Sequence, residues 1–211
     1  MVDIIPAILT DSPLKFKELM LRIEPYVKRV HLDIADGDFV PNKTINGYDE
    51  IMDIESALEF DIHLMVRKPQ EIIKKWLFTH ADRFIIHAES EGDLNTIIDE
   101  LHANRRKVGL TINPEMPVEK LDPHIARVDF VQFMTVNPGF QGSPFVNEVV
   151  DKVSEFHQKY PDIMIMCDGG ITPETASGLV KAGASVLVSG SYVIKSESVE
   201  KAIEELKNCI K

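Results

Sequence analysis

The chain has 211 residues, of which 44% are hydrophobic and 27% charged, and its formal net charge is -11. This size and composition are typical of one globular domain, here residues 1–211, that buries its own core. The acidic charge disfavours nucleic acids and anionic membranes as partners, because both repel a negative surface, and any phosphate must then be held by a local device.

The sequence favours a cytoplasmic location. Its first residues are not typical of a signal peptide, because no basic stretch precedes a long apolar core. No apolar run approaches the roughly 18 residues of a membrane-spanning helix. Cys167 and Cys209 lie in segments of different type, which disfavours a disulfide framework and is consistent with a reducing compartment.

Short apolar runs alternate with amphipathic charged stretches along the chain. In chain order, the apolar runs predict strands near residues 2–9, 28–34, 60–66, 83–87, 106–112, 127–135, 162–168 and 185–189. The stretches between and after them predict helices near residues 13–24, 50–58, 69–79, 92–104, 145–160, 173–182 and 198–210, with a weaker short helix at 117–125. Ser12-Pro13 and Thr172-Pro173 have the pattern of helix starts, and Gly183 that of a helix end.

Eight strands that alternate with helices predict a parallel sheet. An open doubly wound sheet could use the same pattern. The eight regular units, with no G-x-G-x-x-G after the first strand, favour a closed (β/α)8 TIM barrel. Such a barrel has its active site at the C-terminal ends of its strands, so the residues at those ends are the candidates for chemistry.

Histidines and aspartates recur at the predicted strand ends. His31 and Asp33 are two residues apart on one strand, so their side chains point to the same side. His63 and Asp168, at the ends of the third and seventh strands, could join them. Two imidazoles and two carboxylates suit a divalent ion such as Zn²⁺, Mn²⁺ or Fe²⁺. Each residue alone could be a satisfied polar group, but four at matching ends favour one site, since buried charge is costly unless paired or metal-bound.

Glycines form a second group, after the sixth, seventh and eighth strands. They are Gly139, Gly142, Gly169, Gly170 and Gly190. Barrels of this kind hold phosphate with the loops after their last two strands and a helix N-terminus. Glycine lets backbone N–H groups approach an anion, so no lysine is needed. The alternative interpretation is that these glycines only make tight turns.

Several strings of residues follow one another in a specific order. They are Pro6-Ala7-Ile8-Leu9, the run from His31 to Asn42, His63-Leu64-Met65-Val66, Val136-Asn137-Pro138-Gly139-Phe140, Asp168-Gly169-Gly170-Ile171 and Gly190-Ser191. Together they resemble the ribulose-phosphate 3-epimerase family, nearly from end to end. The resemblance implies a metal-dependent epimerase of the pentose phosphate pathway, which interconverts D-ribulose 5-phosphate and D-xylulose 5-phosphate. It also implies a homo-oligomer, a dimer or a hexamer.

The resemblance further implies a role for each matching residue. One divalent ion (Zn, Mn, Fe or Co, with Zn favoured) is held by His31, Asp33, His63 and Asp168. Asp33 and Asp168 also exchange the C3 proton through an enediolate. The sugar phosphate is bound by Gly139, Phe140, Gln141, Gly142, Gly169, Gly170, Gly190 and Ser191. An apolar collar around the reacting carbons is formed by Met65 and Met134.

Three positions depart from the family's pattern. Ala7 stands where serine is common, so a hydrogen bond to substrate is lost. Ala35 stands where methionine is common, and we expect it to widen the collar. Gln141 replaces a glycine, and its side chain either reaches the phosphate or only lines the rim. A wider site would admit D-allulose 6-phosphate, which is one carbon longer, as an alternative substrate.

Other classes of function are also compatible with the fold. A non-catalytic barrel that binds a sugar phosphate would be expected to lack one of the aspartates, and both are present. A Schiff-base lyase needs a lysine at a strand end, whereas Lys107 lies near the start of its strand. His87, at the end of the fourth strand, either supports the site from behind or simply ends the strand.

Overall fold

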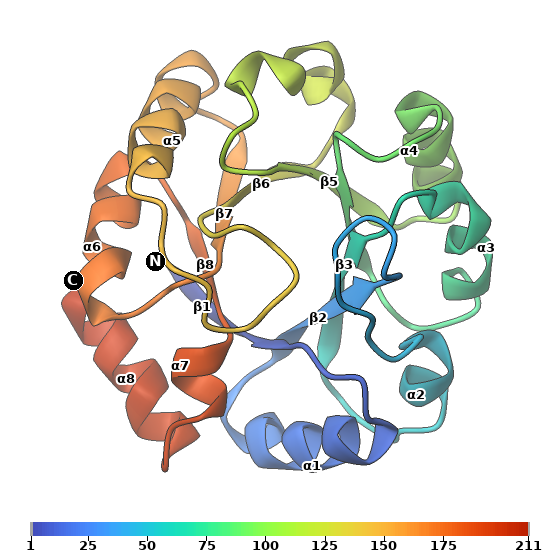
Figure 1. Ribbon diagram of the computed structural model, residues 1–211, viewed down its shortest axis with the longest axis vertical. Coiled ribbons are helices and arrows are strands. Elements are labelled where there is room, and N and C mark those ends of the chain that lie inside the picture. Colours follow the sequence, from blue (N-terminus) through green and yellow to red (C-terminus); the bar gives the residue numbers. More distant parts are fainter. Residues whose placement is uncertain (1, 211) are drawn as a thin grey trace.

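A computed structural model describes residues 2–210 as a closed barrel of eight parallel strands (Figure 1). The strands pair in chain order, and β1 pairs with β8 to close the sheet. They are β1 (Asp3–Ile8), β2 (Arg29–Ala35), β3 (Glu59–Met65), β4 (Arg83–His87), β5 (Lys107–Ile112), β6 (Phe130–Met134), β7 (Met164–Asp168) and β8 (Val186–Ser189). The predicted TIM barrel is confirmed, with a strand in each of the eight predicted places.

Helices form a ring around the barrel (Figure 1). The α-helices are α1 (Pro13–Ile23), α2 (Tyr48–Met52), α3 (Ile73–Trp76), α4 (Leu94–Ala103), α5 (Glu148–Lys159), α6 (Pro173–Ala182), α7 (Ser191–Ile194) and α8 (Val199–Cys209). The 3-10 helices are η1 (Glu24–Tyr26), η2 (Pro69–Glu71), η3 (Val118–Lys120) and η4 (Asp122–Arg127). Within residues 2–210, no helix is long and apolar enough to span a membrane.

Several predicted helices differ in extent from the observed ones. The helix predicted at 50–58 ends at Met52, and beyond it Glu24 accepts hydrogen bonds from Ser56 Oγ at 2.6 Å and Ala57 N at 3.2 Å. The helix predicted at 69–79 is divided into η2 and α3. The weak helix predicted at 117–125 is a pair of 3-10 helices, and α7 was not predicted at all.

The predicted helix ends agree better with the structure. Ser12 Oγ accepts a hydrogen bond from Lys15 N at 3.3 Å, and Pro13 is the first residue of α1. In the same way, Thr172 precedes Pro173 at the start of α6, and Gly183 follows its last residue. Local sequence is enough to set these ends, because capping groups lie within three or four residues of each other.

The barrel interior is a packed core below the level of the strand ends. Its buried side chains include Ile5, Ile85, Phe130, Met166 and Val186. A Cβ at position 109 would lie 2.1 Å from Phe130 Cε2, so Gly109 makes the room that this ring occupies. At the N-terminal ends of the strands, Arg29 pairs with the buried Asp61 at 2.6 Å. The N-terminal ends of the strands thus carry a charged cluster of their own.

Candidate active site

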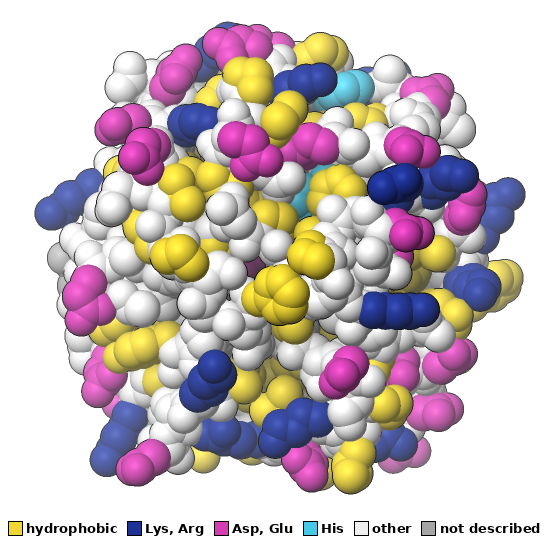
Figure 2. Space-filling view, in the orientation of Figure 1, with side chains coloured by type: hydrophobic (Ala, Val, Ile, Leu, Met, Phe, Trp, Pro, Cys, Tyr) yellow, Lys and Arg dark blue, Asp and Glu magenta, His cyan; other side chains and the backbone are white. Residues whose placement is uncertain are grey.

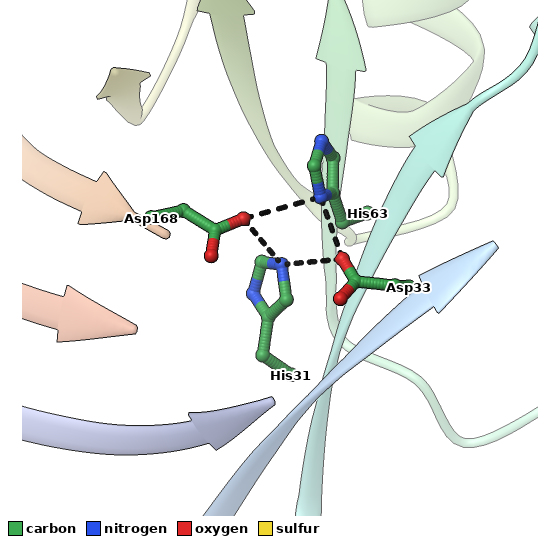
Figure 3. A group of neighbouring side chains, drawn as sticks. All are labelled: His31, Asp33, His63 and Asp168. Atoms are coloured by element: carbon green, nitrogen blue, oxygen red, sulfur yellow. Dashed lines mark hydrogen bonds and ion pairs between the residues drawn. The ribbon is translucent and has the colours of Figure 1, made fainter. Parts of the chain in front are cut away.

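Four ionisable side chains meet at the C-terminal end of the barrel (Figure 3). His31 and Asp33 lie on β2, and both are buried. His63 lies on β3 and is the register partner of Asp33. Asp168 ends β7, and Figure 3 shows its carboxylate reaching toward the others from the side opposite Asp33. The structure thus brings together all four residues that the sequence singled out.

The distances in this cluster suit a divalent metal ion. His63 Nδ1 lies 2.8 Å from Asp33 Oδ1 and 3.4 Å from Asp168 Oδ2. His31 Nε2 lies 3.5 Å from each of the same two oxygens. A tetrahedral ion about 2.1 Å from its ligands separates neighbouring donor atoms by about 3.4 Å. Both ring nitrogens of His31 are also buried without a hydrogen-bond partner among residues 2–210. The residues therefore fit such an ion.

The electrostatics of the cluster also favour a cation. Burial opposes protonation of His31, but the carboxylates of Asp168 and Asp33 outweigh it and raise its pKa to about 10. The same balance raises the pKa of His63. Burial would raise the pKa of Asp168, but His31 and His63 hold it well below its usual range. The carboxylate of Asp168 thus stays ionised, and a positive charge beside it is stabilised.

Two further buried side chains support the cluster from behind. Gln132 on β6 donates from Nε2 to Asp168 Oδ2 at 3.2 Å. His87, the last residue of β4, has its Nε2 2.9 Å from His63 Nε2. Sequence reasoning missed Gln132, although a glutamine in the otherwise apolar strand β6, two residues before Met134, was a usable signal. Burial lowers the pKa of His87 to about 4, despite the nearby Glu89, so its imidazole is neutral.

The two carboxylates of the cluster face a small cavity that opens to solvent and has a volume of about 50 Å³. Asp33 and Asp168 line it, together with Met65 and Met134. Its lining includes no lysine or arginine, and in Figure 2 these side chains lie away from the central hollow. An anion in this cavity would therefore be held by backbone and neutral groups.

All the glycines predicted to hold phosphate line this same cavity, as do Phe140, Gln141 and Ser191. The segment between β6 and α5, gold in Figure 1, arches over the barrel mouth and carries two of these glycines, Gly139 and Gly142, with Phe140 and Gln141 between them. Gly169 has a φ of +105°, and a Cβ there would lie 2.4 Å from Val136 Cγ2, so the chain requires glycine at this turn.

The positions that depart from the family's pattern lie in different places. Ala7 lines the cavity. Ala35 does not, because it packs against Val40 and Met65, with Leu9 and Phe39 beside them. The side-chain nitrogen of Gln141 is buried without a hydrogen-bond partner among the described residues, on the inner side of the loop rather than in solvent.

Comparison with known proteins gives a consistent result. Residues 3–194 match the Ribulose-phosphate 3 epimerase family. The chain is similar to the ribulose-phosphate 3-epimerase of Bacillus subtilis, with 35% identity over 84% of this chain and 85% of the relative. The ribulose-phosphate 3-epimerase of Treponema pallidum is 38% identical over 77% of each chain.

Solved structures with low sequence identity share the fold. Orotidine 5'-monophosphate decarboxylase from Sulfolobus solfataricus matches with a TM-score of 0.70 and 14% identity, over 100% of this chain and 98% of that chain. A 3-hexulose-6-phosphate synthase matches with a TM-score of 0.70 and 17% identity, over 99% of this chain and 100% of that chain. Identities this low show a shared barrel fold only, because one fold carries many different sites.

Proposed function

Since the chain belongs to the ribulose-phosphate 3-epimerase family, we propose that it inverts C3 of D-ribulose 5-phosphate to give D-xylulose 5-phosphate. In this proposal Asp33 and Asp168 are the acid and the base. The observation that carries it is the approach of these two carboxylates from opposite sides of one buried cluster at the bottom of the cavity (Figure 3).

The two carboxylates match the chemistry of an inversion. A hydrogen beside a ketone is weakly acidic, and its removal leaves an enediolate. One aspartate removes the C3 proton from one face, and the other returns a proton to the opposite face. Because Asp33 and Asp168 lie on β2 and β7, a carbon between them exposes one face to each. Their protonation states are linked, so the pair titrates as a unit.

The same four side chains would hold one divalent ion, through the ring nitrogens of His31 and His63 and one oxygen each of Asp33 and Asp168. When bound, the ion would stabilise negative charge on the substrate oxygens. Zn²⁺ suits a site of two imidazoles and two carboxylates. The protein's part is to hold the donor atoms within 4.8 Å of one another in a buried site.

The rest of the cavity suits a short sugar phosphate. Glycine backbone at the rim, including Gly139 and Gly170, would bind the phosphate, while Met65 and Met134 exclude water from the reacting carbons. The five-carbon substrate remains our proposal. Ala35 packs against Met65 of the collar, so D-allulose 6-phosphate is the alternative substrate that the same test has to separate.

The test is hydrogen exchange at C3 in D₂O. The wild-type protein should convert D-ribulose 5-phosphate to D-xylulose 5-phosphate with one solvent deuterium at C3, and convert D-allulose 6-phosphate much more slowly. Asp33→Asn and Asp168→Asn should each lower epimerisation by at least about 100-fold. Because each variant keeps one base, it should exchange the C3 hydrogen of one epimer only, and the two variants should prefer opposite epimers.

Asp162→Asn is the matched control, because Asp162 is exposed and lies just before β7. It should retain wild-type turnover. Near-normal epimerisation by either active-site variant would refute the two-carboxylate mechanism. Faster conversion of the six-carbon sugar would refute the proposed substrate and leave the mechanism intact.

A further inference from the structure

A line of hydrogen-bonding groups runs from the candidate metal site into the barrel wall. His63 presents Nδ1 to the carboxylates of the cluster and Nε2 to His87 Nε2, at 2.9 Å. On the far side of its ring, His87 Nδ1 lies 3.7 Å from Glu89 Oε2. The other oxygen of Glu89 accepts a hydrogen bond from Asn113 N at 2.8 Å. The mechanism proposed above uses neither His87 nor Glu89.

The chemistry of this line sets the direction of its hydrogen bonds. A carboxylate is only an acceptor, so the hydrogen of a neutral His87 belongs on Nδ1, facing Glu89. His87 Nε2 then carries a lone pair and must accept from His63 Nε2–H. Without a metal ion, His63 Nδ1 also carries a hydrogen, because it lies 2.8 Å from the carboxylate of Asp33; a bound ion would displace that hydrogen and take the Nδ1 lone pair, while Nε2–H continues to donate to His87. The reverse arrangement would set a lone pair of His87 against the Glu89 carboxylate.

Packing holds the two rings in this relation. The rings of His63 and His87 are stacked, with centroids 5.1 Å apart and an interplanar angle of 22°. Phe39 packs on His87 with ring centroids 4.6 Å apart. Both imidazoles are fully buried, and His87 Nδ1 and Glu89 Oε2 lie 3.7 Å apart, each buried without a hydrogen-bond partner among the described residues. The negative charge of Glu89 therefore favours hydrogen on Nδ1 of His87, which leaves His87 Nε2 to accept from His63.

We infer that His87 and Glu89 are positioning residues that fix His63 in the tautomer whose Nδ1 lone pair is directed at the candidate metal site. The inference rests on the metal site of the proposed function and adds the groups that orient one of its ligands. Partners behind a metal-binding histidine characteristically fix its tautomer and ring orientation.

The sharpest test is Glu89→Gln, which exchanges a carboxylate for an amide of the same shape. The amide oxygen can still accept from Asn113 N, and its NH₂ group then faces His87 Nδ1. This would reverse the hydrogen bond between His63 and His87 and favour the His63 tautomer that carries its hydrogen on Nδ1, the nitrogen that faces the metal site. The dissociation constant for Zn²⁺, measured without substrate by competition with a chromophoric chelator, should rise by about 10- to 100-fold.

Glu91→Gln is the control. It removes the same negative charge from a side chain that lies two residues after Glu89 and is 57% exposed. It should bind Zn²⁺ as the wild type does. His87→Phe keeps a stacked ring but removes the nitrogen that accepts from His63, so it should weaken Zn²⁺ binding in the same range. This variant is the test if Glu89→Gln does not fold. In the wild type, ¹⁵N chemical shifts should place hydrogen on His87 Nδ1 and His63 Nε2.

The outcomes separate this inference from the proposed function. Two results would overturn this inference and leave the proposed function intact. One is wild-type affinity for Zn²⁺ in folded Glu89→Gln or His87→Phe, and the other is a hydrogen on His87 Nε2 in the wild type. Full epimerase activity in a wild-type protein that binds no divalent ion would instead overturn the metal site of the proposed function, and the positioning role with it. Loss of Zn²⁺ affinity in both variants but not in Glu91→Gln would support the inference.

Discussion

The metal-free protein should lose stability as the pH rises from about 6.5 to about 10, because of His31. The pKa of this imidazole rises from 6.5 to about 10 in the folded state, since Asp168 and Asp33 outweigh the effect of burial. Between these values the folded protein holds a proton that the unfolded chain has released. The stabilisation is therefore complete below pH 6.5 and disappears as the pH passes through the folded-state pKa.

The size of this effect follows from the same two values. Each pH unit between them is worth about 1.36 kcal/mol, which gives at most about 5 kcal/mol over the whole interval. The lowered pKa of Asp168 describes the same interaction and is not counted again. A domain of this kind has a free energy of unfolding of roughly 5–15 kcal/mol, so the change is large enough to measure.

The assay is urea unfolding of chelator-treated protein across this pH interval, with His31→Gln as the comparison. The variant lacks the titrating imidazole, so its free energy of unfolding should fall less with pH than that of the wild type. Zn²⁺-loaded wild type should also show a flatter profile, because the bound ion excludes the proton from the cluster. Parallel pH profiles for metal-free wild type and His31→Gln would refute the assignment of the raised pKa to His31.

Three other outcomes are expected. Ala7→Ser should lower KM for D-ribulose 5-phosphate several-fold, since a hydroxyl in the cavity can add a hydrogen bond of about 1 kcal/mol; an unchanged or higher KM would mean that the cavity is adapted to alanine. Gly169→Ala should reduce the free energy of unfolding by about 1–3 kcal/mol, because the positive φ disfavours alanine and its Cβ would clash with Val136. The variant should also have a higher KM. A melting temperature equal to that of the wild type would contradict this prediction. Chelation should remove epimerase activity and a divalent ion should restore it, so full turnover by protein that mass spectrometry shows to be metal-free would exclude the metal role.

The barrel and most of its site were predictable from the sequence. Strand periodicity is local, so the alternation of apolar and charged segments placed all eight strands. The spacing of His31 and Asp33 put both on one side of a strand, and parallel strands bring their C-terminal ends to one edge. The family resemblance added the roles of the aspartates, and the comparisons established the family.

Tertiary structure decided the parts that depend on contacts between distant strands. Gln132 lies 36 residues before Asp168, and only closure of the barrel brings its amide to the carboxylate. His87 lies 24 residues after His63, and no local pattern reveals which ring nitrogen faces which neighbour.

The position of Ala35 shows the same limit. The sequence places a small residue at the end of β2, but only the structure shows that Phe39 and Leu9 pack beside Ala35. Sequence by itself determined the eight strands, the fold class and the four ionisable residues, because these follow from periodicity and from the direction of strands. The shape of the cavity and the hydrogen bonds behind the site were decided by the tertiary structure, because side chains far apart in sequence fill the same space.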